Sequence, residues 1–180
     1  MKTILVEDDT VFAKILAAVL RDFRHSVRTA NNGNEAWEMY QVEPVPIVLS
    51  DWVMPEMDGL ELCRNIRRYN ANQYCYFVLI TANSGRERYL EAMDAGVDDF
   101  LRKPIDRQDL FNRLRVADRI LTSTARIKKL ESLLPICTYC KRIREGVAQW
   151  VPLEDYMHKH AEAEFSHGIC PTCMKNQDHR

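Results

Sequence analysis

The chain has 180 residues, of which 46% are hydrophobic and 28% charged, and its formal net charge is −1. This composition is that of a globular protein, and the balanced charge argues against a general nucleic-acid or membrane-surface binder. The length leaves room for one ordinary domain plus a remainder. No stretch approaches the roughly 18 apolar residues of a membrane span, and no signal peptide is visible, so we expect a cytoplasmic protein.

The first 120 or so residues alternate between short apolar runs and stretches of helical spacing. The runs predict strands at 4–6, 25–30, 46–50, 76–80 and 97–101. The spacing predicts helices that begin near Thr10 and Asp106 and others over 34–41, 60–69 and 86–94, with Asp9 capping the first and Gly96 ending the fourth. This alternation predicts an α/β fold, a flavodoxin-like, doubly wound parallel sheet of five strands.

The last of these helices continues beyond the predicted sheet. No proline or glycine interrupts 106–134, and Pro135 ends the pattern. Apolar or small residues recur at alternating spacings of four and three, at Val116, Ile120, Ser123, Ile127, Leu130 and Leu134. Such a stripe predicts a coiled-coil seam that makes a homodimer, and the alternative is a long surface helix. We therefore divide the chain into a domain at 1–120, a helical linker at 121–134 and a C-terminal module at 135–180.

Polar residues stand where the predicted strands end. They are Glu7, Asp8, Asp51, Thr81 and Lys103. In a parallel sheet these ends meet at one edge, where ligands bind. Neighbouring carboxylates repel one another, and Mg²⁺, which prefers oxygen ligands, would relieve that repulsion. A lysine and a hydroxyl beside them could bind phosphoryl oxygens, so the set predicts a phosphoryl-transfer site with a carboxylate nucleophile. The alternative is a set of helix caps and solvated loops.

Four segments carry a resemblance to a known family. They are residues 4–9 (ILVEDD), 49–59 (LSDWVMPEMDG), 79–82 (LITA) and 95–104 (AGVDDFLRKP). In order and spacing they resemble the receiver domain of two-component response regulators. The resemblance implies that Asp51 accepts a phosphoryl group from a histidine kinase or a phosphotransfer protein. It further implies an Mg²⁺ site made by Glu7, Asp8, Asp51 and the backbone carbonyl of Val53.

The same resemblance implies a conformational switch. Thr81 and Phe100 would be the switch pair, Lys103 would contact the phosphoryl group, and the Lys103–Pro104 peptide would be cis. Phosphatases of the haloacid dehalogenase type need a second acid two residues after the nucleophile, and Val53 occupies that position. We therefore expect a signalling protein that loses its phosphate slowly, rather than an enzyme that turns over a substrate.

Four of the six cysteines form two C-x-x-C pairs near the C-terminus, Cys137 with Cys140 and Cys170 with Cys173. This is the stoichiometry of a tetrahedral zinc site, and a metal would stabilise so small a module. Between the pairs we predict a strand at 150–151 and a helix at 153–165, which together make a small zinc-ribbon-like α+β module. A dithiol redox sensor and unliganded, packed cysteines are the alternatives.

Other residues of the chain carry weaker signals. His158, His160 and His167 are spare metal ligands, although exposed or hydrogen-bonded histidines are the commoner case. The isolated cysteines, Cys63 and Cys75, are expected in the core. Lys141, Arg142 and Arg144 form a basic patch for which a solvated surface is the simpler interpretation. Three hypotheses remain: a receiver with a zinc-held interaction module, a redox or metal sensor, and a DNA-binding regulator.

Overall fold

The computed structural model describes residues 1–69, 74–82, 85–131, 134–146, 149–161, 164–166, 168–171 and 174. The chain forms two compact units, residues 1–127 and 128–180. Each unit is described by itself below.

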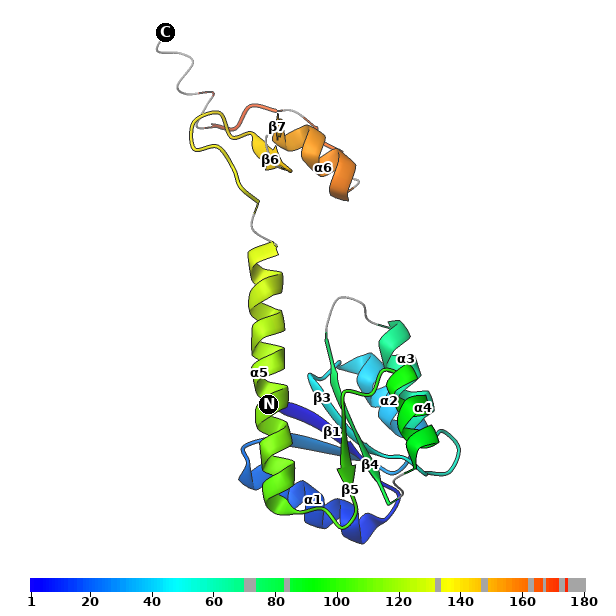
Figure 1. Cartoon of the computed structure of the whole chain (residues 1–180). Coiled ribbons are helices and arrows are strands. Elements are labelled where there is room, and N and C mark those ends of the chain that lie inside the picture. Colours follow the sequence, from blue (N-terminus) through cyan, green and yellow to red (C-terminus); the bar gives the residue numbers. More distant parts are fainter. Residues whose placement is uncertain are drawn as a thin grey trace. The chain divides into compact units, whose positions relative to one another are not determined.

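The first unit is a parallel sheet between helices (Figure 1). Its strands are β1 (Lys2–Val6), β2 (Ser26–Ala30), β3 (Ile47–Asp51), β4 (Tyr76–Thr81) and β5 (Asp99–Arg102). Its helices are α1 (Thr10–Asp22), α2 (Gly33–Val42), α3 (Gly59–Tyr69), α4 (Arg86–Asp94) and α5 (Arg107–Glu131). The strand order is β2-β1-β3-β4-β5 with every neighbouring pair parallel, which confirms the predicted flavodoxin-like α/β fold.

Hydrophobic cores lie on both faces of this sheet. Helices α1 and α5 cover one face, where residues such as Leu20 and Leu110 meet Leu49 of β3. Helices α2, α3 and α4 cover the other, where Tyr40 and Phe77 are buried. Every residue of β4 is buried, as expected for a central strand whose sequence is a continuous apolar run.

Two predicted helix boundaries are confirmed. The Asp9 carboxylate caps α1 by accepting hydrogen bonds from the N–H groups of Val11 (2.9 Å) and Phe12 (3.1 Å). Gly96 follows α4 with a φ of +88°, the left-handed conformation that a glycine adopts without strain.

Strand β3 begins one residue later than its sequence predicts, at Ile47, and two further strands also begin late. Strand β2 begins at Ser26 and not at His25, and β5 begins at Asp99 and not at Val97. The physical reason is the same at both places. The N–H of His25 donates to the Leu20 carbonyl at 3.0 Å, and that of Val97 to the Ala92 carbonyl at 3.0 Å, so these amides close helices.

Helix α5 is shorter at its C-terminal end than predicted. It ends at Glu131, and Leu134 is not helical. Leu134 precedes Pro135, and the residue before a proline disfavours helical backbone. On its sheet side α5 buries Leu110, Leu114, Ala117 and Leu121. The described side chains that follow Leu121 are exposed.

The second unit has an antiparallel hairpin and a helix. Strand β6 (Ile143–Glu145) pairs with β7 (Gln149–Val151), and α6 (Leu153–Ala161) follows. The predicted strand at 150–151 is thus confirmed, whereas β6 was not predicted. The predicted helix over 153–165 is wrong at its end, because 164–166 are not helical. Cys173 and His167 lie outside the described residues. Across the described chain, every helix is too short or too polar to cross a lipid bilayer.

His25 makes the stability of the first unit dependent on pH. Its ring Nδ1 lies 2.8 Å from Thr3 Oγ1. Burial, followed by the nearby N-terminal ammonium, lowers the pKa of His25 against a weaker opposing effect of Asp118. A histidine with a lowered pKa contributes stability above its unfolded value, and this contribution is lost as the pH falls through the folded value.

We therefore expect His25→Gln to lose less unfolding free energy than the wild type between about pH 8 and about pH 5.5 in urea titrations. His158→Gln, on exposed α6, is the matched control and should behave as the wild type does. An equal loss in all three proteins would contradict the role of His25.

Candidate functional site

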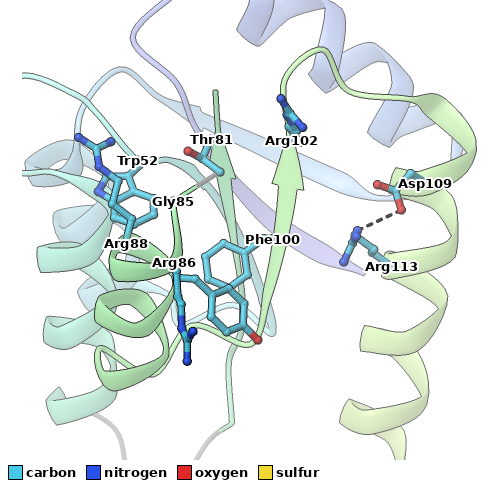
Figure 2. A pocket seen from close by; sticks show the side chains of 10 residues that line it. Trp52, Thr81, Gly85, Arg86, Arg88, Phe100, Arg102, Asp109 and Arg113 are labelled. Carbon is cyan, nitrogen blue, oxygen red and sulfur yellow. Dashed lines mark hydrogen bonds and ion pairs between the residues drawn. The ribbon is translucent and has the colours of Figure 1, made fainter. Parts of the chain in front are cut away.

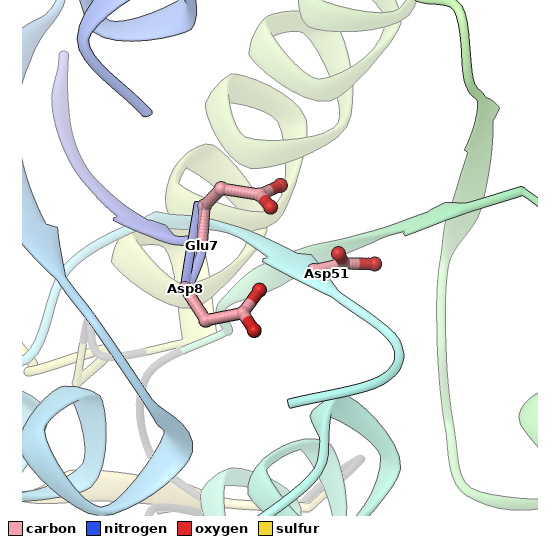
Figure 3. Close-up of side chains that lie close together, drawn as sticks. All are labelled: Glu7, Asp8 and Asp51. Atoms are coloured by element: carbon pink, nitrogen blue, oxygen red, sulfur yellow. The ribbon is translucent and has the colours of Figure 1, made fainter. Parts of the chain in front are cut away.

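Three carboxylates meet at the carboxyl edge of the sheet. Glu7 and Asp8 directly follow β1, and Asp51 is the last residue of the neighbouring strand β3. One oxygen of each lies within 4.8 Å of the others (Figure 3). Among the described residues, these three side chains are the one group of acids, histidines or cysteines that lie close enough together to hold a metal ion.

A single ammonium group is hydrogen-bonded to two of these acids. Lys103, in the loop between β5 and α5, places Nζ 2.9 Å from Glu7 Oε2 and 2.6 Å from Asp51 Oδ2. Its second contact with Glu7, to Oε1, is 3.1 Å long. Lys103 therefore connects the ends of β1 and β3, although it lies 52 residues after Asp51 in the chain.

Burial and neighbouring charges shift the pKa values of Glu7 and Lys103. The Glu7 side chain is 1% exposed, and burial raises its pKa, with a further rise from Asp51 and an opposing hydrogen bond from Lys103. Burial lowers the pKa of Lys103, but its hydrogen bonds and attraction to Asp51 and Glu7 outweigh this and raise it. One ammonium faces three carboxylates, so a further cation would be stabilised here.

The backbone fixes the carboxylate of Asp51. The N–H of Trp52 lies 2.7 Å from Asp51 Oδ1 and 2.9 Å from the Ile80 carbonyl of β4. The Trp52 carbonyl in turn accepts from the N–H of Gly59 at 2.9 Å. Val53, whose carbonyl is an expected metal ligand, lies in this same loop and exposes 66% of its surface. The loop from β3 to α3 thus holds the end of β3 in place.

The two expected switch residues line one pocket. Thr81 ends β4 and is 9% exposed, and Phe100 lies on the neighbouring strand β5. Both line a cavity of about 390 Å³ together with Trp52 and Tyr89 (Figure 2). The rings of Phe100 and Tyr89 are 5.2 Å apart. The Thr81 carbonyl accepts from the N–H of Lys103 at 2.9 Å, and the Lys103–Pro104 peptide is cis.

Sequence reasoning missed one residue that contacts the site. Lys103 Nζ lies 4.7 Å from the centroid of the Phe12 ring, a distance at which the ring attracts a cation. Phe12 was read only as part of the apolar stripe of the first helix. No sequence signal could have found this contact, because Asp8 precedes α1 and the helical spacing of Phe12 does not relate it to the acids.

The cysteines lie in contrasting surroundings. Cys63 and Cys75 are buried, as predicted, and burial raises their pKa values to about 11 and about 12. In the second unit Cys140 and Cys170 are exposed and Cys137 is partly exposed. Hydrogen bonds from the backbone of Cys140 and Tyr139 lower the pKa of the Cys137 thiol. The Cys137 thiol is thus held in a setting that favours the thiolate form.

The first unit matches a family and several characterised relatives. The model of the response regulator receiver domain matches residues 3–115. The chemotaxis protein CheY homolog of Campylobacter jejuni is 32% identical over 116 residues, which is 63% of this chain and 89% of that protein. The response regulator PleD of Caulobacter vibrioides is 35% identical over 118 residues, covering 66% of this chain and 26% of PleD.

Solved structures agree with this relationship. The chemotaxis protein CheY4 of Vibrio cholerae superposes with a TM-score of 0.61 at 25% identity, covering 64% of this chain and 97% of CheY4. The receiver domain of a Pseudomonas aeruginosa sensor histidine kinase, which holds a magnesium ion in its active-site cleft, gives 0.58 at 27% identity. That match covers 66% of this chain and 94% of the other. With its fold, its acidic edge and its sequence, the chain belongs to the response regulator receiver domain family.

Proposed function

We propose that this chain is a response regulator that accepts a phosphoryl group on Asp51 from a histidine kinase or a phosphotransfer protein. The observation that carries the proposal is the surroundings of the Asp51 carboxylate, which is within 4.8 Å of two other acids and hydrogen-bonded to Lys103 at 2.6 Å. Asp51 is 13% exposed at its side chain, so an incoming phosphoryl group can reach it. When Asp51 is phosphorylated, the Lys103 ammonium can move its hydrogen bond from the carboxylate to a phosphoryl oxygen.

The residues present fit a magnesium ion. Glu7, Asp8 and Asp51 would hold it with the backbone carbonyl of Val53, and oxygen donors of this kind with remaining water ligands suit Mg²⁺. The excess of acids over the single ammonium supports this choice. When bound, the ion would supply positive charge against the phosphoryl oxygens as the Asp51–phosphate bond forms. The magnesium-bound relative from Pseudomonas aeruginosa supports the same assignment.

We further propose that phosphorylation changes the pocket lined by Thr81 and Phe100. A phosphoryl group adds about 1.5 to 2 negative charges and three acceptor oxygens. The Thr81 hydroxyl can turn toward these oxygens, and the Phe100 ring can fill the space that it leaves. Because both side chains line the same cavity, such a movement would alter the surface between α4 and α5.

Phosphotransfer in the presence of Mg²⁺ tests the central claim. We expect the wild type to be labelled by a phosphodonor and Asp51→Asn to take up no label, because an amide cannot act as the nucleophile. Asp9→Asn is the matched control: Asp9 is exposed, caps α1 and is not part of the acidic cluster, and asparagine also caps helices. Labelling of Asp51→Asn at the wild-type rate, or no labelling of the wild type, would refute the proposal.

For the second unit we propose a zinc site made by Cys137, Cys140, Cys170 and Cys173. The lowered pKa of Cys137 supports it, because zinc binds the thiolate form. The unit buries little apolar surface: Ile143 is the buried hydrophobic residue among its described members. A structural metal would stabilise so small a fold.

We expect about one zinc ion per chain in metal analysis of the purified protein. Cys140→Ser should lose most of it, whereas Cys63→Ala, which alters a buried thiol of the first unit, should keep it. A wild type that lacks zinc and forms a reversible disulfide in mild oxidant would instead favour the redox-sensor hypothesis.

We also propose that α5 forms a homodimer. Ile120 and Ile127 expose 38% and 56% of their surfaces, and Ser123 between them is exposed. This stripe faces away from the buried side of α5, so a second copy could cover it. Ile127→Asp should shift the protein toward the monomer in light scattering, with Arg126→Asp as the control on an adjacent polar position.

A further inference from the structure

The two faces of the β6–β7 hairpin differ sharply. Alternation along β6 places Ile143 and Glu145 on one face. Helix α6 covers that face: Lys159 Nζ and His160 Nε2 lie 2.6 Å and 3.1 Å from Glu145 Oε1. Ile143 is accordingly 1% exposed. The opposite face is left to solvent.

That opposite face carries an arginine and a tryptophan side by side. Arg144 of β6 and Trp150 of β7 are direct cross-strand partners, so their side chains lie on the same face. Trp150 is 43% exposed, and Arg144 is exposed as well. Arg142, which directly precedes β6, is also exposed.

A tight turn beside the hairpin presents a second aromatic ring. The N–H of Cys137 donates to the Arg142 carbonyl at 2.8 Å, and that of Lys141 to the Cys137 carbonyl at 3.0 Å. Lys141 has a φ of +60°, which helps to reverse the chain. Tyr139, at the tip of this turn, is 94% exposed. A phenol ring left so open in a small fold contributes almost nothing to the core.

The positive charges of this surface have no acidic partner among the residues that the structure describes. In the described part of the chain, no acidic side chain pairs with Lys141, Arg142 or Arg144. Lys141 Nζ donates to the Thr138 carbonyl at 2.8 Å. Glu145, the nearest acid along the strand, points to the other face and is bound by α6. Three cations and two open aromatic rings are thus exposed within residues 139–150 of this small unit, and we call these five side chains the hairpin surface.

We propose that the hairpin surface binds single-stranded nucleic acid. Tyr139 and Trp150 would stack against bases, and Lys141, Arg142 and Arg144 would contact phosphates. Stacking of this kind is independent of sequence, because every base has a flat face. The balanced net charge of the chain excludes a general polyanion binder, but it does not prevent a local site of this composition.

An acidic protein is the competing partner, and the size of the surface argues against it. A stable protein interface buries about 800 Å² on each side, with some 20 residues or more. The hairpin surface offers a handful of side chains from a three-residue strand, its partner and one turn. A single strand needs only about four nucleotides to engage two stacking rings and neighbouring cations.

Fluorescence anisotropy of the full chain with labelled single strands of about 12 nucleotides, DNA and RNA, tests the proposal. Three phosphate contacts at about 0.7 each predict that raising salt from about 50 to about 200 mM weakens binding roughly 20-fold. Tyr139→Ala and Trp150→Ala should each weaken it about 10-fold, whereas Tyr139→Phe keeps the ring and should bind as the wild type does. Arg144→Ala should also flatten the salt dependence.

Circular dichroism of each variant checks that the fold is retained. The binding assay uses the wild type without any phosphodonor, so a positive result is independent of phosphorylation. Absence of salt-dependent binding, or binding that Tyr139→Ala leaves unchanged, would overturn the proposal. Tighter binding of a labelled oligoglutamate peptide than of either single strand would also overturn it and assign the surface to an acidic protein.

Discussion

Arg67→Ala is expected to lower the free energy of unfolding of the receiver unit by about 3 kcal/mol. The guanidinium of Arg67, on α3, donates to the carbonyls of Gly96 (2.9 Å) and Cys75 (2.7 Å) and to Asp98 Oδ2 (2.6 Å). The side chains of Arg67 and Asp98 are only 26% and 15% exposed. Truncation would leave a partly buried carboxylate without its cation, which costs more than the loss of one hydrogen bond.

The contacts of Asp98 extend this effect beyond α3. Its Oδ2 also accepts from the N–H of Phe77 at 2.6 Å, at the start of β4. Arg67 therefore connects α3, the α4–β5 connection and β4 through one side chain. A Cβ added at Gly96 would lie 3.1 Å from Arg67 Nε, so the same side chain also closes over this glycine.

Urea titrations monitored by circular dichroism measure the loss, and Arg64→Ala provides the control. Arg64 lies one turn earlier on α3 and pairs with Glu91 at 3.6 Å, with 42% and 55% of the two side chains exposed. An exposed pair of this kind contributes about 0.5 kcal/mol. Similar destabilisation by the two substitutions would contradict the central role assigned to Arg67.

The order of elements in the receiver could be predicted because each element has its own period. Continuous apolar runs such as residues 76–80 specify buried parallel strands, and Asp9 and Gly96 specify helix ends through local chemistry. The errors fell where a boundary depends on hydrogen bonds to a preceding helix, as at His25 and Val97. Strand β6 was missed because its sequence, Ile-Arg-Glu, has one residue of high strand propensity, whereas β7 has the adjacent pair Trp150 and Val151.

The acidic edge was predictable for a topological reason. Residues that directly follow parallel strands converge, so the meeting of Asp8 and Asp51 required only the strand order. The contact of Phe12 with Lys103 required the orientation of α1 over the sheet, which the sequence does not specify. Arg67 shows the same limit, because in sequence it resembles any basic residue of a surface helix, and only packing reveals its three acceptors.

Gly59→Ala is expected to damage both the stability and the phosphoacceptor, because Gly59 lies against the backbone of Asp51. A Cβ built on Gly59 would lie 2.3 Å from the Asp51 carbonyl oxygen and 2.8 Å from Leu79 Cδ1. The carbonyl oxygen belongs to the backbone and cannot move without shifting β3, and the Leu79 methyl group can turn only within a fully buried core. Overpacking of this kind costs about 1–3 kcal/mol. A displacement of the carboxylate by about 1 Å would slow phosphoryl transfer roughly 100-fold.

Gly85→Ala is the matched control, since no atom lies within 4 Å of a Cβ added there. Its backbone is extended, with a φ of −110°, which alanine adopts without strain. We expect Gly85→Ala to keep the wild-type stability and labelling rate, and Gly59→Ala to lose both in urea titrations and phosphotransfer assays. If Gly59→Ala lost stability but was labelled at the wild-type rate, the carboxylate would not depend on this contact. The position of Asp51 would then be set by the hydrogen bonds of Trp52 and Lys103 alone, since these are the remaining groups that hold its carboxylate oxygens.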